Sequence, residues 1–183
     1  MAAESAATAY NAGLAALEAG RPEDARHWFA AVSDGSDPEY RPRAAFWLGL
    51  DGAAPLEERR RHLSTVVAEG PARDGADAAY MLAALERDAG RPRHRRHWLE
   101  VAADRAADAA DGPRRADALL ELAHLDHSAG AVDDARRRFE EVAGTGDPEC
   151  AQEARTALGS LAGDPELPLP RSAEPAVRPS VHA

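Results

Sequence analysis

The chain has 183 residues, which is long enough for one domain with a sizeable buried core. It is acidic, with 32 Asp and Glu residues against 22 basic ones, so nucleic-acid binding would need a local basic face. The single cysteine, Cys150, excludes a disulfide within the chain and a cysteine-based zinc cluster. No signal-peptide pattern and no membrane-spanning apolar run is visible, so we expect a cytoplasmic protein that does not enter a membrane.

The residue types favour helices throughout the chain. Ala, Leu, Glu and Arg dominate, and these are good helix formers, whereas β-branched residues are few and never alternate over a strand length. The sequence therefore predicts an all-α fold. Every basic residue other than histidine is arginine, and neither lysine nor isoleucine occurs, which we interpret as the codon bias of a GC-rich bacterial genome.

One segment recurs along the chain. Residues 20–32 read GRPEDARHWFAAV, and residues 90–102 read GRPRHRRHWLEVA, with glycine, proline, histidine and tryptophan in matching places. The offset is 70 residues, or 2 × 35. A period of this size is typical of arrays of helical hairpins. The repeat therefore predicts a chain built from successive pairs of antiparallel helices.

In the first half of the chain we expect four helices. The first covers residues 4–19 and ends at Gly20, in the way a left-handed glycine commonly ends a helix. The second begins at Pro22, the third opens with an Asp N-cap and a first-turn Pro at residues 37–39, and the fourth begins near Pro55. Apolar residues at helical spacing are expected to face the core: Leu14, Leu17, Ala25, Phe29, Val32, Leu63 and Val66.

The second half is expected to hold five further helices. The fifth covers residues 74–88 and the sixth follows it, but the interval from Gly90 to Gly130 is 40 residues, about five more than one repeat. This insertion either lengthens the sixth helix or makes a longer turn at residues 112–113. The seventh and eighth helices lie on either side of Gly130, and a ninth, over residues 148–161, has no hairpin partner and is interpreted as a cap.

Three features recur in register along these hairpins. A small residue lies midway along each first helix: Gly13, Gly49, Ala83 and Ala123. In three hairpins a glycine follows seven residues later: Gly20, Gly90 and Gly130. A small residue in the second helix precedes a large apolar one by four: Ala25 with Phe29, and Ala135 with Phe139. In this the chain resembles the tetratricopeptide repeat (TPR) family, although Arg59 and Arg95 occupy the small site of the second and third hairpins.

The resemblance implies a right-handed superhelical solenoid of about four hairpins with a capping helix. We therefore divide the chain into a helical-repeat domain, residues 1–163, and a proline-rich tail, residues 164–183, which we expect to be disordered. By the same resemblance, the protein would be a non-enzymatic scaffold or adaptor without a cofactor. It would bind a peptide or helix of another protein in a concave groove lined by the first helix of each hairpin.

Groove positions follow from the resemblance and from helical spacing. They are Tyr10, Leu14, Arg43, Phe46, Asp77, Tyr80, Arg87, Asp117, Leu120, His124 and His127. Tyr10, Phe46 and Tyr80 lie three residues before the small site of the first three hairpins and would form an aromatic ladder for the apolar side chains of a peptide. The alternative is that these rings are partly buried between adjacent first helices.

Other candidate sites have plainer interpretations. His124 and His127 are spaced to share a metal ion, but no third ligand lies at a suitable distance, so we expect them to contact a partner. Arginine runs at residues 59–61, 91–96 and 136–138 are expected on the convex side as solvated faces paired with glutamates, so that no nucleic acid is bound. Cys150 is expected to be a packing residue.

Two alternatives to the scaffold hypothesis stay open at this point. The chain would associate with itself, its groove filled by a second copy or by its own tail, in which Pro168 and Pro170 flank Leu169 and precede Arg171. In the other alternative it would be a metal-dependent regulator or an enzyme that uses His124 and His127.

Overall fold

The computed structural model describes residues 2–145 and 147–163, so the tail predicted over residues 164–183 lies outside the described part. Over the described residues the chain is all-helical, as predicted. It forms nine helices: α1 (Ala2–Glu18), α2 (Pro22–Ser33), α3 (Tyr40–Leu50), α4 (Leu56–Glu69), α5 (Ala72–Asp88), α6 (Pro92–Asp108), α7 (Gly112–Ser128), α8 (Val132–Ala143) and α9 (Pro148–Gly163).

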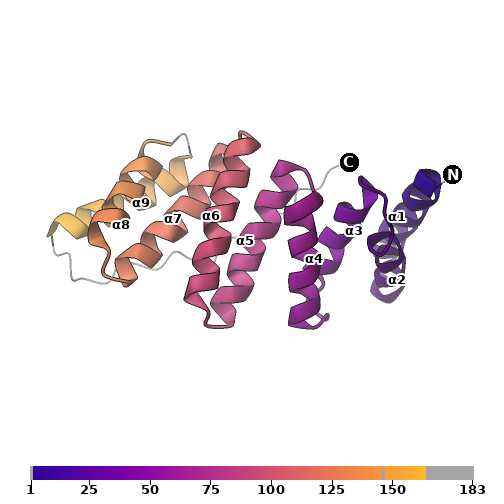
Figure 1. Ribbon diagram of the computed structural model, residues 1–183. Coiled ribbons are helices and arrows are strands. Elements are labelled where there is room, and N and C mark those ends of the chain that lie inside the picture. The colour runs from indigo at the N-terminus through magenta and orange to yellow at the C-terminus, as the bar shows by residue number, and fades with distance from the viewer. Residues whose placement is uncertain (1, 146, 164–183) are drawn as a thin grey trace.

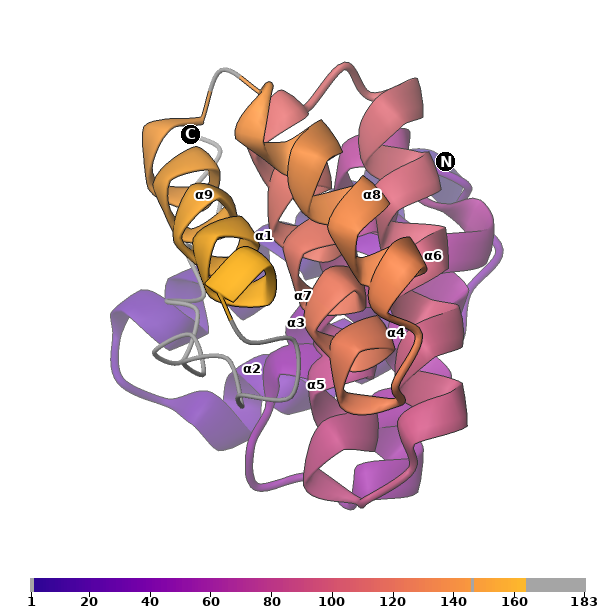
Figure 2. The ribbon, with the colours of Figure 1, turned by 90° about the vertical axis from the view of Figure 1, so that its left-hand side faces the viewer.

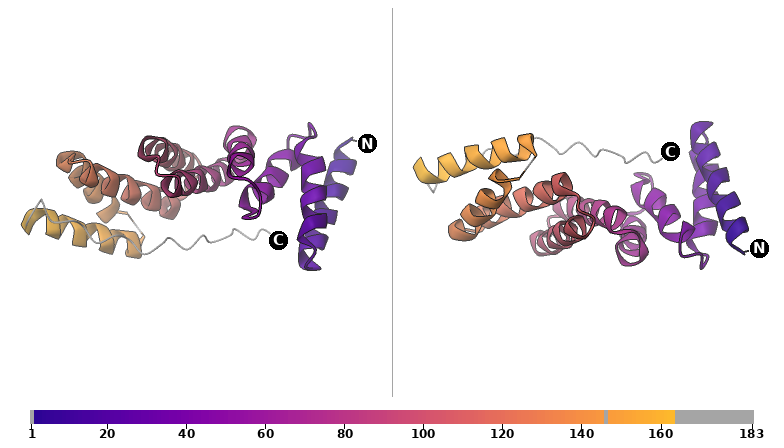
Figure 3. Two further views of the ribbon diagram at one scale, coloured as in Figure 1. Left: turned by 90° about the horizontal axis from the view of Figure 1, so that it is seen from below. Right: turned by 90° about the horizontal axis from the view of Figure 1, so that it is seen from above.

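The helices pack in the order in which they occur in the chain. Figures 1 and 3 show a row that runs from α1 at one end to α9 at the other. Each helix packs against its neighbours in sequence, and each odd-numbered helix also touches the next odd-numbered one. Between the even-numbered helices, the described residues make no backbone approach of this kind. The odd-numbered helices therefore form one connected layer, and α2, α4, α6 and α8 cover its other side (Figure 2).

The apolar core is divided along this row into three clusters. One joins α1, α2 and α3 around Phe29, a second joins α3, α4 and α5 around Leu63, and the third extends from α5 to α9 around Phe139. Each cluster holds residues of at least three helices, which is expected when a single hairpin cannot bury its own apolar face. None of the described helices has both the length and the apolar character required to cross a bilayer.

Left-handed residues end the longer helices, as the sequence predicts. Gly20, Gly90 and Gly130 follow α1, α5 and α7 with φ angles of 69°, 66° and 78°. After α6 the same place is taken by Ala110, with φ 53°. Glycine reaches this region without steric cost, whereas alanine adopts it only against the contact of its Cβ with the backbone.

The five-residue insertion lengthens the sixth helix. α6 has 17 residues, whereas α2 and α8 each have 12. The alternative, a longer turn at residues 112–113, is wrong, because Gly112 and Pro113 form the first turn of α7. There the Asp111 side chain accepts a hydrogen bond of 3.2 Å from the Arg114 N–H and caps the new helix.

One predicted helix start is displaced. The third helix begins at Tyr40, and Asp37 precedes it by a turn, in which its Oδ1 accepts hydrogen bonds from the N–H groups of Glu39 and Tyr40 at 3.0 and 2.9 Å. The matching Asp147 accepts from the Cys150 N–H at 2.8 Å at the start of α9. Aspartate thus caps both segments, although Pro38 lies outside the helix.

Candidate partner-binding surface

The predicted groove residues of the first two hairpins remain accessible in part. Tyr10, Leu14 and Phe46 are half-buried, and Arg43 is exposed and forms an ion pair of 3.2 Å with Glu39 of its own turn. The Tyr10 hydroxyl oxygen accepts a hydrogen bond of 3.1 Å from the indole N–H of Trp47. A partner can therefore reach aromatic surface at this end of the row.

The predicted residues of the middle hairpins are placed differently. Asp77, Tyr80 and Leu120 are buried, so these side chains contribute to packing between helices and not to an accessible face. Arg114 of α7 covers the first two of them: its Nε donates to Asp77 Oδ1 at 2.6 Å, and its guanidinium lies 5.2 Å from the centre of the Tyr80 ring. Burial raises the pKa of the Tyr80 hydroxyl well above its usual range. For Tyr80, the alternative of burial between first helices thus describes the observed position.

Asp117 is engaged at the junction of α7 and α9. The Cys150 thiol donates a hydrogen bond of 3.2 Å to its Oδ1, and Arg114 donates to its Oδ2 at 3.4 Å. Cys150 is buried, and burial together with this carboxylate raises the pKa of the thiol above its usual range. A thiol that stays protonated is a poor nucleophile, in keeping with the packing role predicted for it.

The two predicted histidines and Arg87 lie near the ends of their helices. His124 is half-buried, its Nε2 lies 3.0 Å from Glu153 Oε1, and its ring packs edge-on against Phe139 at 5.1 Å. His127 is also half-buried, and Arg87 is exposed and pairs with the adjacent Asp88. Over residues 2–145 and 147–163, no group of three or more His, Cys, Asp and Glu side chains is placed to share a metal ion.

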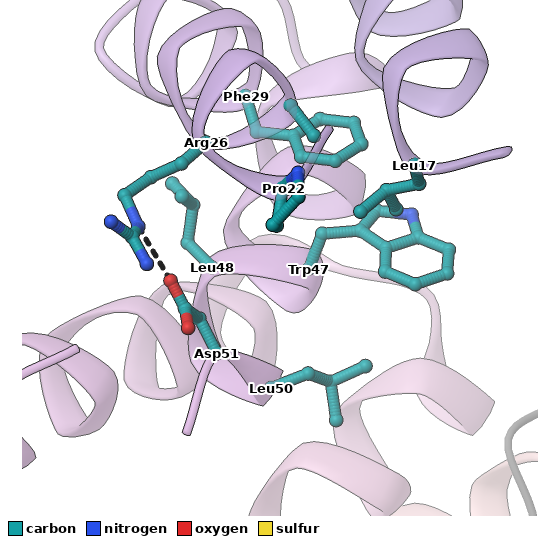
Figure 4. Close-up of a pocket in the computed structure, with 9 residues that line it drawn as sticks. Leu17, Pro22, Arg26, Phe29, Trp47, Leu48, Leu50 and Asp51 are labelled. Carbon is teal, nitrogen blue, oxygen red and sulfur yellow. Dashed lines mark hydrogen bonds and ion pairs between the residues drawn. The ribbon is translucent and has the colours of Figure 1, made fainter. Parts of the chain in front are cut away.

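A surface hollow of about 200 Å³ lies where the first two hairpins meet (Figure 4). Its walls come from the end of α1, the start of α2 and the second half of α3. The lining is mainly apolar: Leu17, Pro22, Ala25, Phe29, Trp47, Leu48 and Leu50, with Arg26 and Asp51. The Trp47 and Phe29 rings stack nearly parallel, 5.9 Å apart, and give one wall a broad apolar surface.

The polar side of this hollow is an ion pair. Arg26 Nε donates to Asp51 Oδ2 at 2.6 Å, and Figure 4 shows the pair across the hollow from Leu17 and Trp47. The hydrogen bond from Arg26 holds the pKa of the Asp51 carboxyl below its usual range. Because the two charges are paired, the hollow is electrically neutral and its apolar wall decides what it accepts.

The sequence analysis missed this hollow, although one signal for it was present. The Arg26–Asp51 pair joins α2 to the end of α3, and Arg60–Glu86 and Arg95–Glu121 join the next even-numbered helices to the next odd-numbered ones. Asp51, Glu86 and Glu121 are spaced at 35 residues, so these carboxylates repeat with the hairpins. The interpretation of the arginine runs as solvated convex faces is therefore wrong for Arg60 and Arg95, whose side chains are mostly buried between hairpins.

Comparisons of the chain with protein-family models, with curated protein sequences and with solved structures found no match. The surface at the first two hairpins is therefore interpreted from its own geometry.

Proposed function

We propose that this protein is a TPR-like, non-enzymatic scaffold whose odd-numbered helices line the concave side of a right-handed solenoid. In this proposal it works in the cytoplasm without a cofactor and binds a peptide or helix of a partner protein, and not a nucleic acid or a membrane. The sequential packing of the helices and the 35-residue repeat support it, since repeats of this type build extended binding surfaces.

The hollow between the first two hairpins is the observation that carries the proposal. At about 200 Å³ it is smaller than the pockets of roughly 300–1,000 Å³ that hold small molecules. Its size and its aromatic wall suit a single large apolar side chain. Buried anchors of this kind contribute most of the binding free energy at protein interfaces.

Partly exposed aromatic surface continues from the hollow along the odd-numbered helices. Tyr10 is hydrogen-bonded to Trp47 of the lining, and Phe46 is the residue before it. A peptide or helix that places one apolar residue in the hollow can extend over Tyr10 or Phe46. Recognition by apolar residues at regular spacing is the usual mode for such ligands.

A charge placed at the hollow tests the proposal. We expect Leu50→Glu to abolish capture of partner proteins from an extract of the native cell, because a buried apolar anchor would meet an unpaired carboxylate. Tyr10→Ala with Phe46→Ala should weaken the same capture. Bound proteins are identified by mass spectrometry, and circular dichroism checks that each variant is still helical.

Leu56→Glu is the matched control. Leu56 is a leucine of α4 that is 39% exposed and does not line the hollow, so the same change there should leave capture intact. If Leu50→Glu captures the same proteins as the unchanged chain, the hollow is not the binding site. A chain that binds only a second copy of itself, seen as a concentration-dependent mass in light scattering, would instead favour the self-association alternative.

A further inference from the structure

A second surface hollow lies between the third and fourth hairpins. Its volume is about 310 Å³, and it is lined by the first turns of α6 and the last turn of α7: Pro92, Arg93, Arg96, Leu125, Ser128 and Ala129. The apolar part of the lining consists of Pro92, Leu125 and Ala129, and the two arginines supply its charge.

The two hollows are the same feature of the repeat. Pro92 and Arg96 lie 70 residues after Pro22 and Arg26, which line the first hollow. Arg96 donates to Asp126 at 2.6 Å, as Arg26 does to Asp51 at 2.6 Å. Each hollow therefore lies between the start of an even-numbered helix and the end of the next odd-numbered helix, beside an ion pair that joins the two.

The charge differs between the two hollows. In the first, the carboxylate of Asp51 is part of the lining and neutralises Arg26. In the second, no carboxylate is part of the lining, because Asp126 is 3% exposed and is shared between Arg96 and Arg138. Arg93 replaces Glu23 of the matching helix, is exposed, and has no ion-pair or hydrogen-bond partner among the described residues. The second hollow is therefore a local basic site on a chain of net charge −10.

We propose that this second hollow binds an acidic side chain, Asp or Glu, that adjoins a large apolar residue in the partner peptide. The inference rests on the proposed function and adds the chemistry of the partner. The free guanidinium of Arg93 matches a carboxylate in charge and in geometry, since arginine donates two parallel hydrogen bonds to it. Leu125, Ala129 and Pro92 then receive the neighbouring apolar side chain.

The test uses a library of random 12-residue peptides displayed on phage and selected on the full chain. The strongest selected peptide is synthesised, and its affinity is measured by fluorescence anisotropy. We expect the selected peptides to be enriched in Asp or Glu beside a large apolar residue. We expect Arg93→Glu to weaken the strongest peptide at least tenfold, and a peptide with Lys in place of its acidic residue to bind the Arg93→Glu chain again.

Arg136→Glu is the matched control. Arg136 is an exposed arginine of α8 that has no partner among the described residues and does not line the hollow, so this variant should change the affinity by less than twofold. Arg93→Glu should fold normally, because an acidic residue in the first turn of α6 is favourable for the helix.

The results separate the two proposals. Selected peptides that lose binding to Leu50→Glu but keep it to Arg93→Glu would overturn the acidic preference and leave the scaffold proposal standing. Equal losses for Arg93→Glu and Arg136→Glu would show attraction to overall charge and would also overturn it. If no peptide is enriched on the unchanged chain, both proposals fail.

Discussion

At the scale of single residues, two glycines set how closely the helices of a hairpin approach. A Cβ added to Gly13 would lie 2.6 Å from the Phe29 ring, and one added to Gly49 would lie 2.6 Å from the Leu63 side chain. Both large residues belong to the second helix of the same hairpin and are fully or almost fully buried. The small residue midway along the first helix therefore makes room for the large residue that fills the core of the hairpin.

We expect Gly49→Ala to destabilise the protein, although alanine is the better helix former by about 1 kcal/mol. Overpacking a buried contact costs about 1–3 kcal/mol, and Leu63 is itself fully buried and has little room to move. Urea denaturation followed by circular dichroism measures the change in the free energy of unfolding.

Gly159→Ala is the control for this prediction and should have the opposite sign. Gly159 occupies the position in α9 that matches Gly49 in α3, but it is exposed and a Cβ there meets no atom within 4 Å. Helix propensity then acts alone and should stabilise the protein by up to about 1 kcal/mol. Equal effects at both positions would contradict the role assigned to the contact with Leu63.

At the scale of helices, ion pairs join one hairpin to the next. Arg60 of α4 donates to Glu86 of α5 at 2.7 Å, with side chains that are 11% and 3% exposed. Arg91 lies 3.8 Å from the other oxygen of Glu86. A carboxylate this deeply buried requires its arginine, since an unpaired buried charge is strongly unfavourable.

We expect Arg60→Met to destabilise the protein by about 2 kcal/mol or more. Breaking a buried pair costs roughly 3–5 kcal/mol, and Arg91 is close enough to offset part of this. The double variant Arg60→Met with Glu86→Gln should recover most of the loss, because no buried charge remains. Chemical denaturation of the single and double variants measures the difference.

An exposed ion pair provides the comparison. The side chains of Arg137 and Asp134 on α8 are 73% and 49% exposed, and Arg137→Met should change the free energy of unfolding by less than about 0.5 kcal/mol. If both Arg→Met variants cost the same, burial of the Arg60–Glu86 pair would have no energetic consequence.

At the scale of the whole molecule, stability is distributed along the row of helices. The three core clusters follow one another from α1 to α9, and each helix contacts only its neighbours in sequence and the next odd-numbered helices. In such an array each part depends on the parts next to it and only weakly on distant ones. Local unfolding at one end need not involve the other.

We therefore expect Phe139→Ala to act locally. Removing this fully buried ring should cost roughly 3–5 kcal/mol within its cluster. Native-state hydrogen exchange should then show faster exchange in α7, α8 and α9, with unchanged protection in α1, α2 and α3. Phe29→Ala, the matching change at the other end, should give the reverse pattern. Uniformly faster exchange in either variant would mean that the chain unfolds as one cooperative unit.

The sequence by itself determined the helices, their order and most of their ends. Helix propensity, apolar residues at helical spacing and the glycines at positions 20, 90 and 130 are local features, and a local signal is enough to start, orient and end a helix. The 35-residue repeat likewise predicted which small residue packs against which large one, because both belong to one hairpin.

Only the tertiary structure decided which surface is accessible. Tyr10 and Tyr80 occupy matching positions in sequence, yet Tyr10 is half-buried and Tyr80 is covered by Arg114, which lies 34 residues further along the chain. The two hollows also require residues of successive hairpins to meet, as in the pairs Arg26–Asp51 and Arg96–Asp126. Burial at such junctions depends on how neighbouring hairpins pack, and side-chain spacing within one helix carries no information about that packing.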